Sequence, residues 1–287
     1  MDNRGREGLS DGYLPTEEKA DAGSTWYRRE GDLISVLVTG DAFHEMELIR
    51  RFTLPETPGL IITSPPYNLD IKYANSEDAL SWQDYLTWSF LWMRTAYRMS
   101  PAGTRFCLNI PLDSNKGGKQ AVYVDLVIAA FRAGWKYHTT IIWNENNISR
   151  RTAWGSWRSA TAPFVTAPVE MIVVFYKETW KRELPEGIDA HNIEAEEFKD
   201  LTLGLWTFNG ERKAKFGHPA PFPEELPRRL ITLYSFKGDW VLDPFVGSGT
   251  TSAAAWKLGR NSIGIDVSEE YVKIAKMRLE SLDVPVS

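Results

Sequence analysis

Apolar runs of strand length alternate with amphipathic segments of helix length along most of this chain. Short apolar runs bounded by Gly, Pro or acidic residues predict buried strands, and apolar residues at helical spacing predict helices. The predicted strands are 33–38, 60–63, 104–110, 137–143, 169–176, 240–243 and 262–266, and the predicted helices are 43–52, 82–99, 122–131, 224–235, 250–258 and a last one capped by Ser268. This alternation predicts an α/β fold with a mostly parallel sheet and helices on both faces.

Three segments lack this rhythm. Residues 1–25 are charged and Gly-rich, which predicts a disordered tail and leaves 26–287 as a single domain. Within that domain, the loop 144–168 is polar, and the insert 180–217 is charged and poorly periodic. Both are therefore expected at the surface, where binding residues concentrate.

Composition narrows the class of protein. With 287 residues, 43% hydrophobic and 25% charged, the chain is of ordinary globular composition. Its one cysteine, Cys107, excludes an internal disulfide and predicts a reducing, cytoplasmic location. No apolar run reaches the ~20 residues that span a bilayer, so no membrane contact is expected. Because the formal net charge is −5, a nucleic acid would have to bind a local basic patch.

A stiff corner follows the strand 60–63. It reads Thr63-Ser64-Pro65-Pro66-Tyr67, and its two prolines fix their own φ and hold Ser64 in extended geometry. Backbone carbonyls are thereby fixed beside the Ser64 hydroxyl and the Tyr67 ring. Rigid acceptors next to a stacking face suit a flat, amine-bearing ring such as a nucleobase. A proline turn that only closes a core strand is the alternative.

A glycine loop follows the strand 240–243. Here the strand ends in Asp243, turns through Gly247-Ser248-Gly249 and enters a helix of small residues. Such glycines let a ligand approach the backbone and let the helix pack closely on the sheet. There is no third glycine for a dinucleotide fingerprint and no lysine for a triphosphate loop.

A second carboxylate, Asp266, ends the next strand. At this position it can accept hydrogen bonds from both hydroxyl groups of a ribose. The two acids favour a nucleoside without phosphates whose other end is positively charged, such as S-adenosyl-L-methionine. A tight packing turn without a ligand is the alternative. No metal is expected.

Together with the block His218-Pro219-Ala220-Pro221-Phe222-Pro223, the corner and the loop resemble the β-class amino-DNA methyltransferases, which modify exocyclic amines of adenine or cytosine in DNA. The resemblance covers residues 33–282, and the three blocks occur in the order of that class, which is circularly permuted relative to other methyltransferases. The resemblance implies a Rossmann-like, S-adenosylmethionine-dependent methyltransferase fold. It implies the catalytic residues Ser64, Pro65, Pro66 and Tyr67, and a cofactor site made of Asp243, Phe245, Gly247, Gly249, Thr250, Asp266, Asp41, His218 and Phe222.

The chemistry that the resemblance implies takes place at an amine nitrogen. The Ser64 Oγ and the Pro65 carbonyl would accept the two amine hydrogens, and Tyr67 would stack on a flipped base. Methylation at carbon 5 of cytosine needs a cysteine nucleophile, whereas Cys107 lies in an apolar strand. Ser at position 64 favours N4 of cytosine, because Asp there more often accompanies adenine. N6 of adenine is the alternative.

Double-stranded DNA is the implied substrate, and a local basic and aromatic surface is expected to contact it. The candidates lie in the loop 144–168, with the insert 180–217 as a second recognition element. These residues are Arg150, Arg151, Trp154, Trp157 and Arg158. A homodimer and a cognate restriction endonuclease are open alternatives for further partners. Two other functions stay open: methylation of RNA or of a protein amide, and DNA binding without catalysis.

Overall fold

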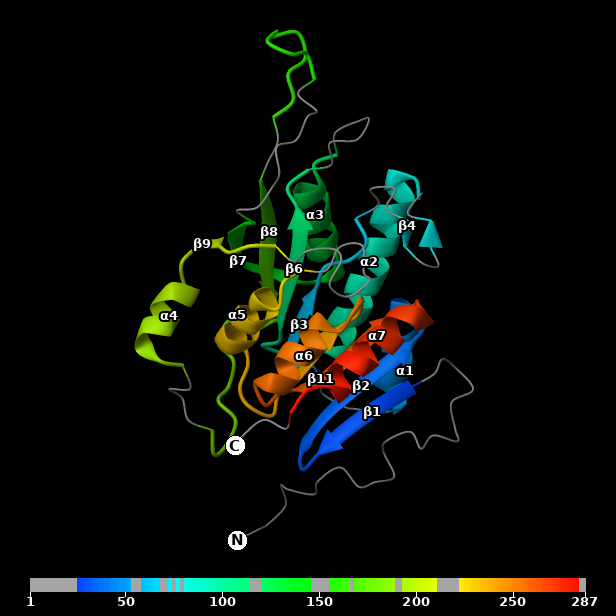
Figure 1. The fold of residues 1–287 in the computed structure, drawn as a ribbon, viewed down its shortest axis with the longest axis vertical. Helices are drawn as coiled ribbons and strands as arrows, with labels where there is room; N and C mark the ends of the chain where they lie inside the picture. The colour runs from blue at the N-terminus through cyan, green and yellow to red at the C-terminus, as the bar shows by residue number, and fades with distance from the viewer. Residues whose placement is uncertain are drawn as a thin grey trace.

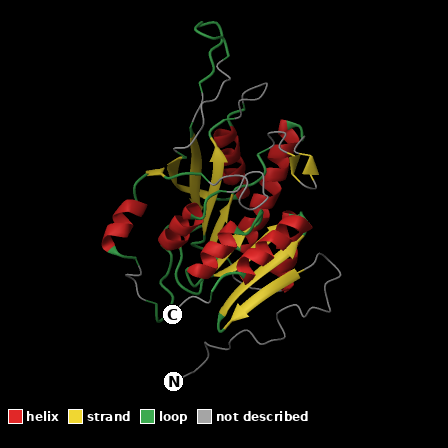
Figure 2. Cartoon of the chain, viewed as in Figure 1, coloured by secondary structure: helices red, strands yellow, loops and turns green. Residues whose placement is uncertain are grey.

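One nine-stranded sheet with helices on both faces forms the body of the protein (Figures 1 and 2). The computed structural model describes residues 25–52, 58–67, 72–73, 76–77, 80–113, 120–145, 155–165, 168–188, 193–210 and 222–283. Within these ranges, no helix has the length and apolar character that crossing a membrane requires.

The strands of the sheet are mainly parallel. They are β1 (Thr25–Glu30), β2 (Leu33–Thr39), β3 (Leu60–Thr63), β6 (Arg105–Pro111), β7 (Lys136–Asn144), β8 (Val169–Tyr176), β9 (Leu205–Thr207), β10 (Trp240–Asp243) and β11 (Asn261–Asp266). Their order is β1-β2-β11-β10-β3-β6-β8-β7-β9. The five from β2 to β6 are parallel, whereas β1 and β8 run antiparallel to their neighbours. Apart from this sheet, the described residues contain the short pair β4 (Lys72–Tyr73) and β5 (Ser76–Glu77).

Seven helices occur in the described ranges. They are α1 (Ala42–Phe52), α2 (Trp82–Met99), α3 (Val122–Ala133), α4 (Ala195–Leu201), α5 (Glu225–Tyr234), α6 (Thr250–Lys257) and α7 (Glu269–Glu280). Two of them begin with a serine cap, because Ser81 and Ser268 accept hydrogen bonds from the backbone N–H of the third residue that follows. The Ser268 cap is the one predicted from the sequence. Gly134 ends α3 in the left-handed conformation, at φ 111°.

Two apolar cores lie on opposite faces of the sheet. Successive side chains of β3 point to opposite faces of the sheet. Ile61 packs in the core under α1, α2 and α3, whereas Leu60 and Ile62 pack in the core under α5 and α6. All three side chains are fully buried. A strand that is covered on both faces reads as a continuous apolar run, and this explains the pattern by which it was predicted.

Every predicted strand and helix is present, but the sequence pattern missed several features. These are β1, the short pair β4 and β5, the short strand β9, the short helix α4 and the antiparallel direction of β8. An apolar run that is buried on both faces carries no mark of its direction, so β8 could not be distinguished from a parallel strand. The division into a tail and a single domain stays a prediction.

The carboxylate of Asp243 joins β3, β10 and α6. The Thr63 hydroxyl donates to its Oδ1 at 2.8 Å, and the Thr251 hydroxyl donates to its Oδ2 at 2.6 Å. The backbone N–H of Phe245 adds a third bond to Oδ1 at 3.1 Å. Asp243 is only 1% exposed, and burial raises its pKa to about 6, against the effect of these three donors.

Gly249 sets the distance between α6 and α7. It precedes α6 with φ at 78°, and a Cβ built on it would lie 2.8 Å from the Cβ and 2.9 Å from the Cα of Ala275 on α7. A side chain here would therefore push the helices apart. Gly259 has a similar φ of 71° but open space around the position of a Cβ.

We expect the stability of Asp243→Asn to differ from wild type in a pH-dependent way. A carboxyl group with a raised pKa contributes stability that is lost as the pH rises through its folded-state value. Between about pH 4 and about pH 7, the free energy of unfolding of the wild type should therefore fall by about 2 kcal/mol relative to that of the variant. Urea unfolding at a series of pH values measures this, and a constant difference between the two proteins would contradict it.

Gly249→Ala should destabilise the protein more than Gly259→Ala. Both variants place a side chain at positive φ, which costs about 1–2 kcal/mol, but only the first also forces a contact with α7, at about 1–3 kcal/mol more. Urea unfolding of both variants and the wild type gives the difference. Equal losses would show that α7 does not pack on Gly249 as described.

Candidate functional site at the carboxyl edge of the sheet

The predicted site residues follow four strands that end at one edge of the sheet. Because β2, β11, β10 and β3 are adjacent and parallel, the segments after them lie side by side. Those segments hold Asp41, Asp266, the glycine loop and the Ser64–Tyr67 corner. Ligands of open parallel sheets bind outside this edge.

Asp266 is anchored and still partly accessible. Its Oδ2 accepts a hydrogen bond from the N–H of Gly247 at 2.9 Å, and its Oδ1 accepts one from the N–H of Ser268 at 2.9 Å. Burial raises its pKa above the ordinary value, although the side chain is only half-buried. Since a carboxylate can accept about four hydrogen bonds, Asp266 keeps capacity for a ligand hydroxyl.

A second acidic group lies at the end of β2. Asp41 is exposed and accepts a hydrogen bond from the N–H of His44 at 3.1 Å. Glu45, one turn into α1, is only 6% exposed, and burial is the main cause of its raised pKa. Its carboxylate packs over Gly40, where an added Cβ would lie 2.4 Å from Oε1. The sequence prediction missed Glu45, for which the only signal was an acid in the first turn of the helix.

Three predicted cofactor-binding side chains make contacts within the protein, and their predicted contacts with a cofactor stay predictions. The carboxylate of Asp243 is enclosed by its own donors, as described above. Thr250 accepts a hydrogen bond from Arg278 on α7 at 3.0 Å. Phe245 packs on Trp88 and Trp92, with ring centroids 5.4 Å and 5.2 Å away. These contacts hold the loop in position.

The backbone of the loop is itself firmly held. Gly247 and Gly249 both have positive φ, at 49° and 78°. The N–H of Gly249 donates to the carbonyl of Val246 at 2.9 Å, and the N–H of Val246 donates to the carbonyl of Ile265 at 2.8 Å. Phe222 is half-buried against the core under α5, and His218 lies outside the described residues.

The proline corner is fixed from two sides. Tyr85 on α2 donates a hydrogen bond to the Pro66 carbonyl at 2.8 Å. The hydroxyl groups of Ser64 and Tyr67 are hydrogen-bonded to each other. Pro65 is buried, whereas Ser64, Pro66 and Tyr67 are half-buried. The structure thus brings the predicted catalytic residues together at the end of β3.

Two polar residues behind the corner were missed by the sequence prediction. The Tyr67 hydroxyl lies 3.2 Å from the Asn109 carbonyl and 3.4 Å from Glu170 Oε2, and Asn109 Nδ2 donates to that Glu170 oxygen as well. Burial and the nearby Glu145 raise the pKa of Glu170 to about 7, against the effect of the Asn109 and Tyr67 hydrogen bonds. The signal in the sequence was a single acid within the apolar strand 169–176.

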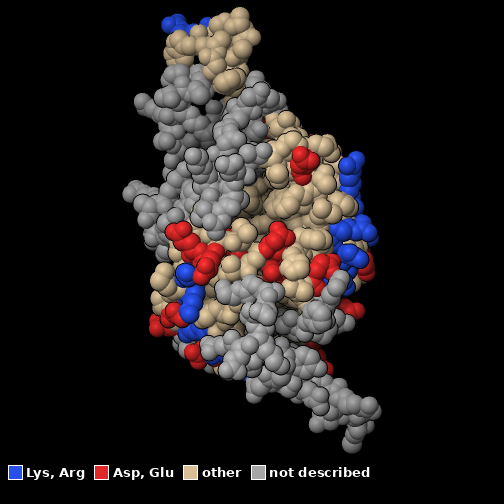
Figure 3. Space-filling view, turned by 90° about the vertical axis from the view of Figure 1, so that its right-hand side faces the viewer, with Lys and Arg blue, Asp and Glu red and all other residues tan. Residues whose placement is uncertain are grey.

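The predicted DNA-contacting residues are only partly described. Trp157 is 65% exposed, and Arg158 is exposed with φ at 55°. They belong to the segment 155–165, which projects beyond the sheet between β7 and β8 (top of Figure 1). Arg150, Arg151 and Trp154 lie outside the described residues. On the face drawn in Figure 3, basic and acidic side chains are interspersed among the described residues, without a continuous basic surface.

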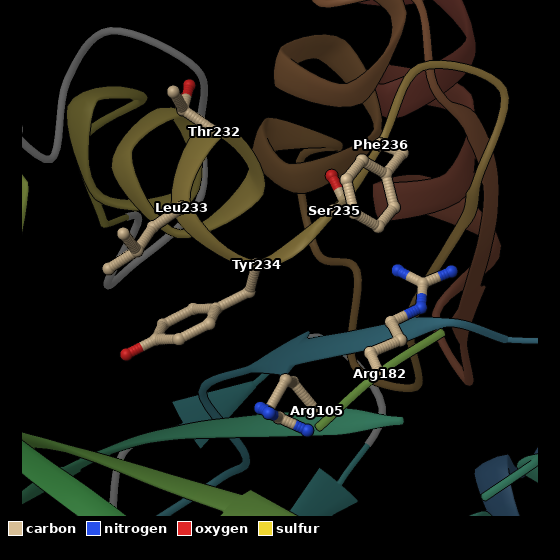
Figure 4. Close-up of a pocket in the computed structure, with 7 residues that line it drawn as sticks. All are labelled: Arg105, Arg182, Thr232, Leu233, Tyr234, Ser235 and Phe236. Carbon is tan, nitrogen blue, oxygen red and sulfur yellow. The ribbon is translucent and has the colours of Figure 1, made fainter. Parts of the chain in front are cut away.

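A small cavity lies at the opposite edge of the sheet, and its charged groups are already paired. It has a volume of about 130 Å³ and is lined by Arg105, Arg182 and residues 232–236 (Figure 4). Arg182 donates two hydrogen bonds to Asp239, and Arg105 donates to the carbonyls of Gly103 and Trp180. The carboxyl edge therefore remains the candidate functional site.

Comparisons with known proteins agree with this arrangement. The family model for DNA methylases that act on N6 or N4 matches residues 59–277. Type II methyltransferase M.MjaVI of Methanocaldococcus jannaschii is 54% identical over 158 residues, which are 55% of this chain and 80% of that protein. Type II methyltransferase M.HpaI of Haemophilus parainfluenzae is 30% identical over 233 residues, which are 77% of this chain and 68% of that protein.

Two solved structures share the fold. TTHA0409 of Thermus thermophilus, in complex with S-adenosyl-L-methionine, has a TM-score of 0.66 at 24% identity, over 86% of this chain and 95% of that one. PvuII DNA methyltransferase, which is cytosine-N4-specific, has a TM-score of 0.65 at 21% identity, over 88% of each chain. The fold is that of the S-adenosylmethionine-dependent methyltransferases, and the chain belongs to the amino-DNA methyltransferase family.

Proposed function

We propose that this DNA methyltransferase transfers a methyl group from S-adenosyl-L-methionine to the N4 amine of cytosine in double-stranded DNA. One observation carries the choice of base. The first residue after β3, at the start of the proline corner, is Ser64. Its side chain offers a hydroxyl group as acceptor, and not a carboxylate. The relatives of this chain are named Type II methyltransferases, and this supports a specific DNA sequence as the substrate.

The acids of the carboxyl edge fit this cofactor. Asp266 is held by two backbone N–H groups yet half-buried, which suits a carboxylate that also accepts ribose hydroxyls. The carboxyl groups of Asp41 and Glu45 add negative charge beside it, which suits a ligand with a cationic end. When bound, S-adenosyl-L-methionine supplies an electrophilic methyl group on a positively charged sulfur.

The corner supplies acceptors for the amine. The lone pair of an exocyclic amine is delocalised into the ring, so the nitrogen is a poor nucleophile. Acceptance of its two hydrogens by the Ser64 Oγ and the Pro65 carbonyl concentrates electron density on nitrogen and orients the lone pair. Tyr85 contributes by fixing the Pro66 carbonyl, which keeps the corner rigid.

A covalent intermediate has no place in this mechanism. Cys107 is fully buried in β6, and burial raises the pKa of its thiol far above the ordinary value. A neutral, inaccessible thiol cannot attack a base. The chain is therefore suited to chemistry at an amine, not at carbon 5 of cytosine.

The base must leave the duplex to reach the corner, and the segment 155–165 is the proposed DNA contact. It carries the exposed Trp157 and Arg158 and projects beyond the sheet at the top of Figure 1. The described part of the insert 180–217 is less suited, because the acidic residues of α4 include Glu197, which pairs with Arg228 on α5 at 2.8 Å. We assign sequence recognition mainly to the loop 144–168.

Unmethylated plasmid DNA treated with the enzyme should acquire N4-methylcytosine. The expected product follows from a hydroxyl, and not a carboxylate, at position 64. Mass analysis of the digested nucleosides identifies the modified base, and a reaction without S-adenosyl-L-methionine is the control. N6-methyladenine without N4-methylcytosine would reverse the choice of base, and no methylated nucleoside would refute the activity.

Ser64→Ala should lower the methylation rate about 10²-fold or more, because one of the two acceptors for the amine is lost. Stability should change little, since Ser64 is only half-buried. Single-turnover rates with labelled cofactor measure the effect. Ser281→Ala, which removes an exposed hydroxyl at the end of α7, is the matched control. Equal rates for Ser64→Ala and wild type would remove Ser64 from the mechanism.

A further inference from the structure

Glu170 lies directly behind the amine-binding corner. It stands near the start of β8, opposite Pro111 of β6 and Trp143 of β7. Its Oε2 accepts a hydrogen bond from Asn109 Nδ2 and lies 3.4 Å from the Tyr67 hydroxyl. Since Tyr67 is hydrogen-bonded to Ser64, a continuous path of polar groups runs from Glu170 to the Ser64 Oγ.

The side-chain amide of Asn109 is oriented for the ionised state of Glu170. Its Nδ2 donates to Glu170 and approaches the Tyr67 hydroxyl at 3.3 Å, whereas its Oδ1 is buried without a partner among the described residues. In the present orientation the amide stabilises a carboxylate.

The charge on Glu170 decides which groups donate to the Tyr67 oxygen. If Glu170 is protonated, Tyr67 donates to the backbone carbonyl of Asn109 at 3.2 Å, and the Tyr67 oxygen accepts from the Glu170 O–H and from Asn109 Nδ2. Both lone pairs of the Tyr67 oxygen are then occupied, and the Ser64 proton is turned outward. An outward proton on Ser64 would face the N–H groups of an amine. Two donors would then meet, and no hydrogen bond would form between them. If Glu170 is ionised, it attracts the Tyr67 proton, because a charged acceptor forms the stronger hydrogen bond. The Tyr67 oxygen can then accept the Ser64 proton.

We propose that Glu170 is a positioning residue for the methylation: while it is ionised, Tyr67 donates toward it, Ser64 donates to Tyr67, and the Ser64 Oγ is left to accept a hydrogen from the amine. This inference rests on the proposed function of the corner. Glu170 acts only through Tyr67 and Ser64, and all the groups involved are provided by this chain.

The electrostatic surroundings place the change of state near neutral pH. The pKa of Glu170 is raised to about 7, first by burial and second by the carboxylate of Glu145, just after β7. The hydrogen bonds from Asn109 and Tyr67 oppose both effects. The Ser64 Oγ should therefore be free to accept a hydrogen from the amine above neutral pH, and in a decreasing fraction of molecules below it.

The test is the pH dependence of the single-turnover methylation rate at saturating DNA and S-adenosyl-L-methionine. The wild-type rate should rise about tenfold between about pH 6 and about pH 8. Glu170→Gln presents an amide oxygen to Tyr67 at every pH, so its rate should change less than about twofold over the same range. Glu145→Gln, which removes the neighbouring charge but keeps Glu170, should move the rise to lower pH without abolishing it.

A second measurement does not depend on activity. Carbon-13 NMR of glutamate carboxyl groups, in protein without DNA or cofactor, should show a resonance that titrates near neutral pH and is missing from Glu170→Gln. Tyr67→Phe should keep this titration but lose the rise in rate, because the path to Ser64 is cut.

Several outcomes would overturn the proposal. They are a wild-type rate that does not change with pH, a rise that Glu170→Gln retains, and the absence of a carboxyl group that titrates near neutral pH. If Glu170→Gln does not fold, a rise that Glu145→Gln leaves unmoved overturns it as well. A wild-type protein that methylates no DNA at any pH would instead refute the proposed function.

Discussion

The bonds that three protein donors make to the Asp243 carboxylate are the constraint on which the rest of the site depends. Thr63 is the last residue of β3, and the residue after it is Ser64, so the bond from Thr63 fixes where the proline corner begins. Thr251 lies in the first turn of α6, so its bond fixes how the glycine loop ends. A single buried carboxylate therefore sets the distance between the corner and the loop, which are separated by about 180 residues of sequence.

This arrangement requires buried acids, and buried acids are costly. Asp243, Glu170 and Glu45 are each more stable in the protonated form than an exposed carboxyl group would be, because burial disfavours charge. Each acid sits at the carboxyl edge of the sheet or next to it. A protein under selection for stability alone would place apolar residues there. Their concentration at one edge is best explained by the chemistry of that edge, where pKa shifts of this kind gather.

The fold could be predicted from the sequence because its signals are local, whereas part of the site could not. Apolar runs such as 60–63 and the serine cap at 268 can each be recognised from a few consecutive residues. The same local reading identified the residues of the corner and the loop, but it could not say which way their side chains point. Asp243 and Thr250 have the residue types of a ligand site, and their hydrogen bonds go to the protein.

Glu170 shows the reverse limit. A lone acid in an apolar strand gives no hint of its partners, because these are distant in sequence. Asn109 lies on β6, which pairs with β8, and Tyr67 lies in the corner that follows β3, on the other side of β6. The direction of β8 was also the feature of the sheet that the apolar pattern could not fix.

Those two failures have one cause, and it bears on how the site works. In the parallel part of the sheet, each strand ends at the carboxyl edge and delivers one segment to it. An antiparallel strand begins at that edge, so the early residues of β8 lie where the other strands end. Glu170 reaches the rear of the proline corner because it is the second residue of such a strand. The reversal of β8 thus gives the corner a half-buried acidic neighbour that a wholly parallel arrangement would have placed at the far edge.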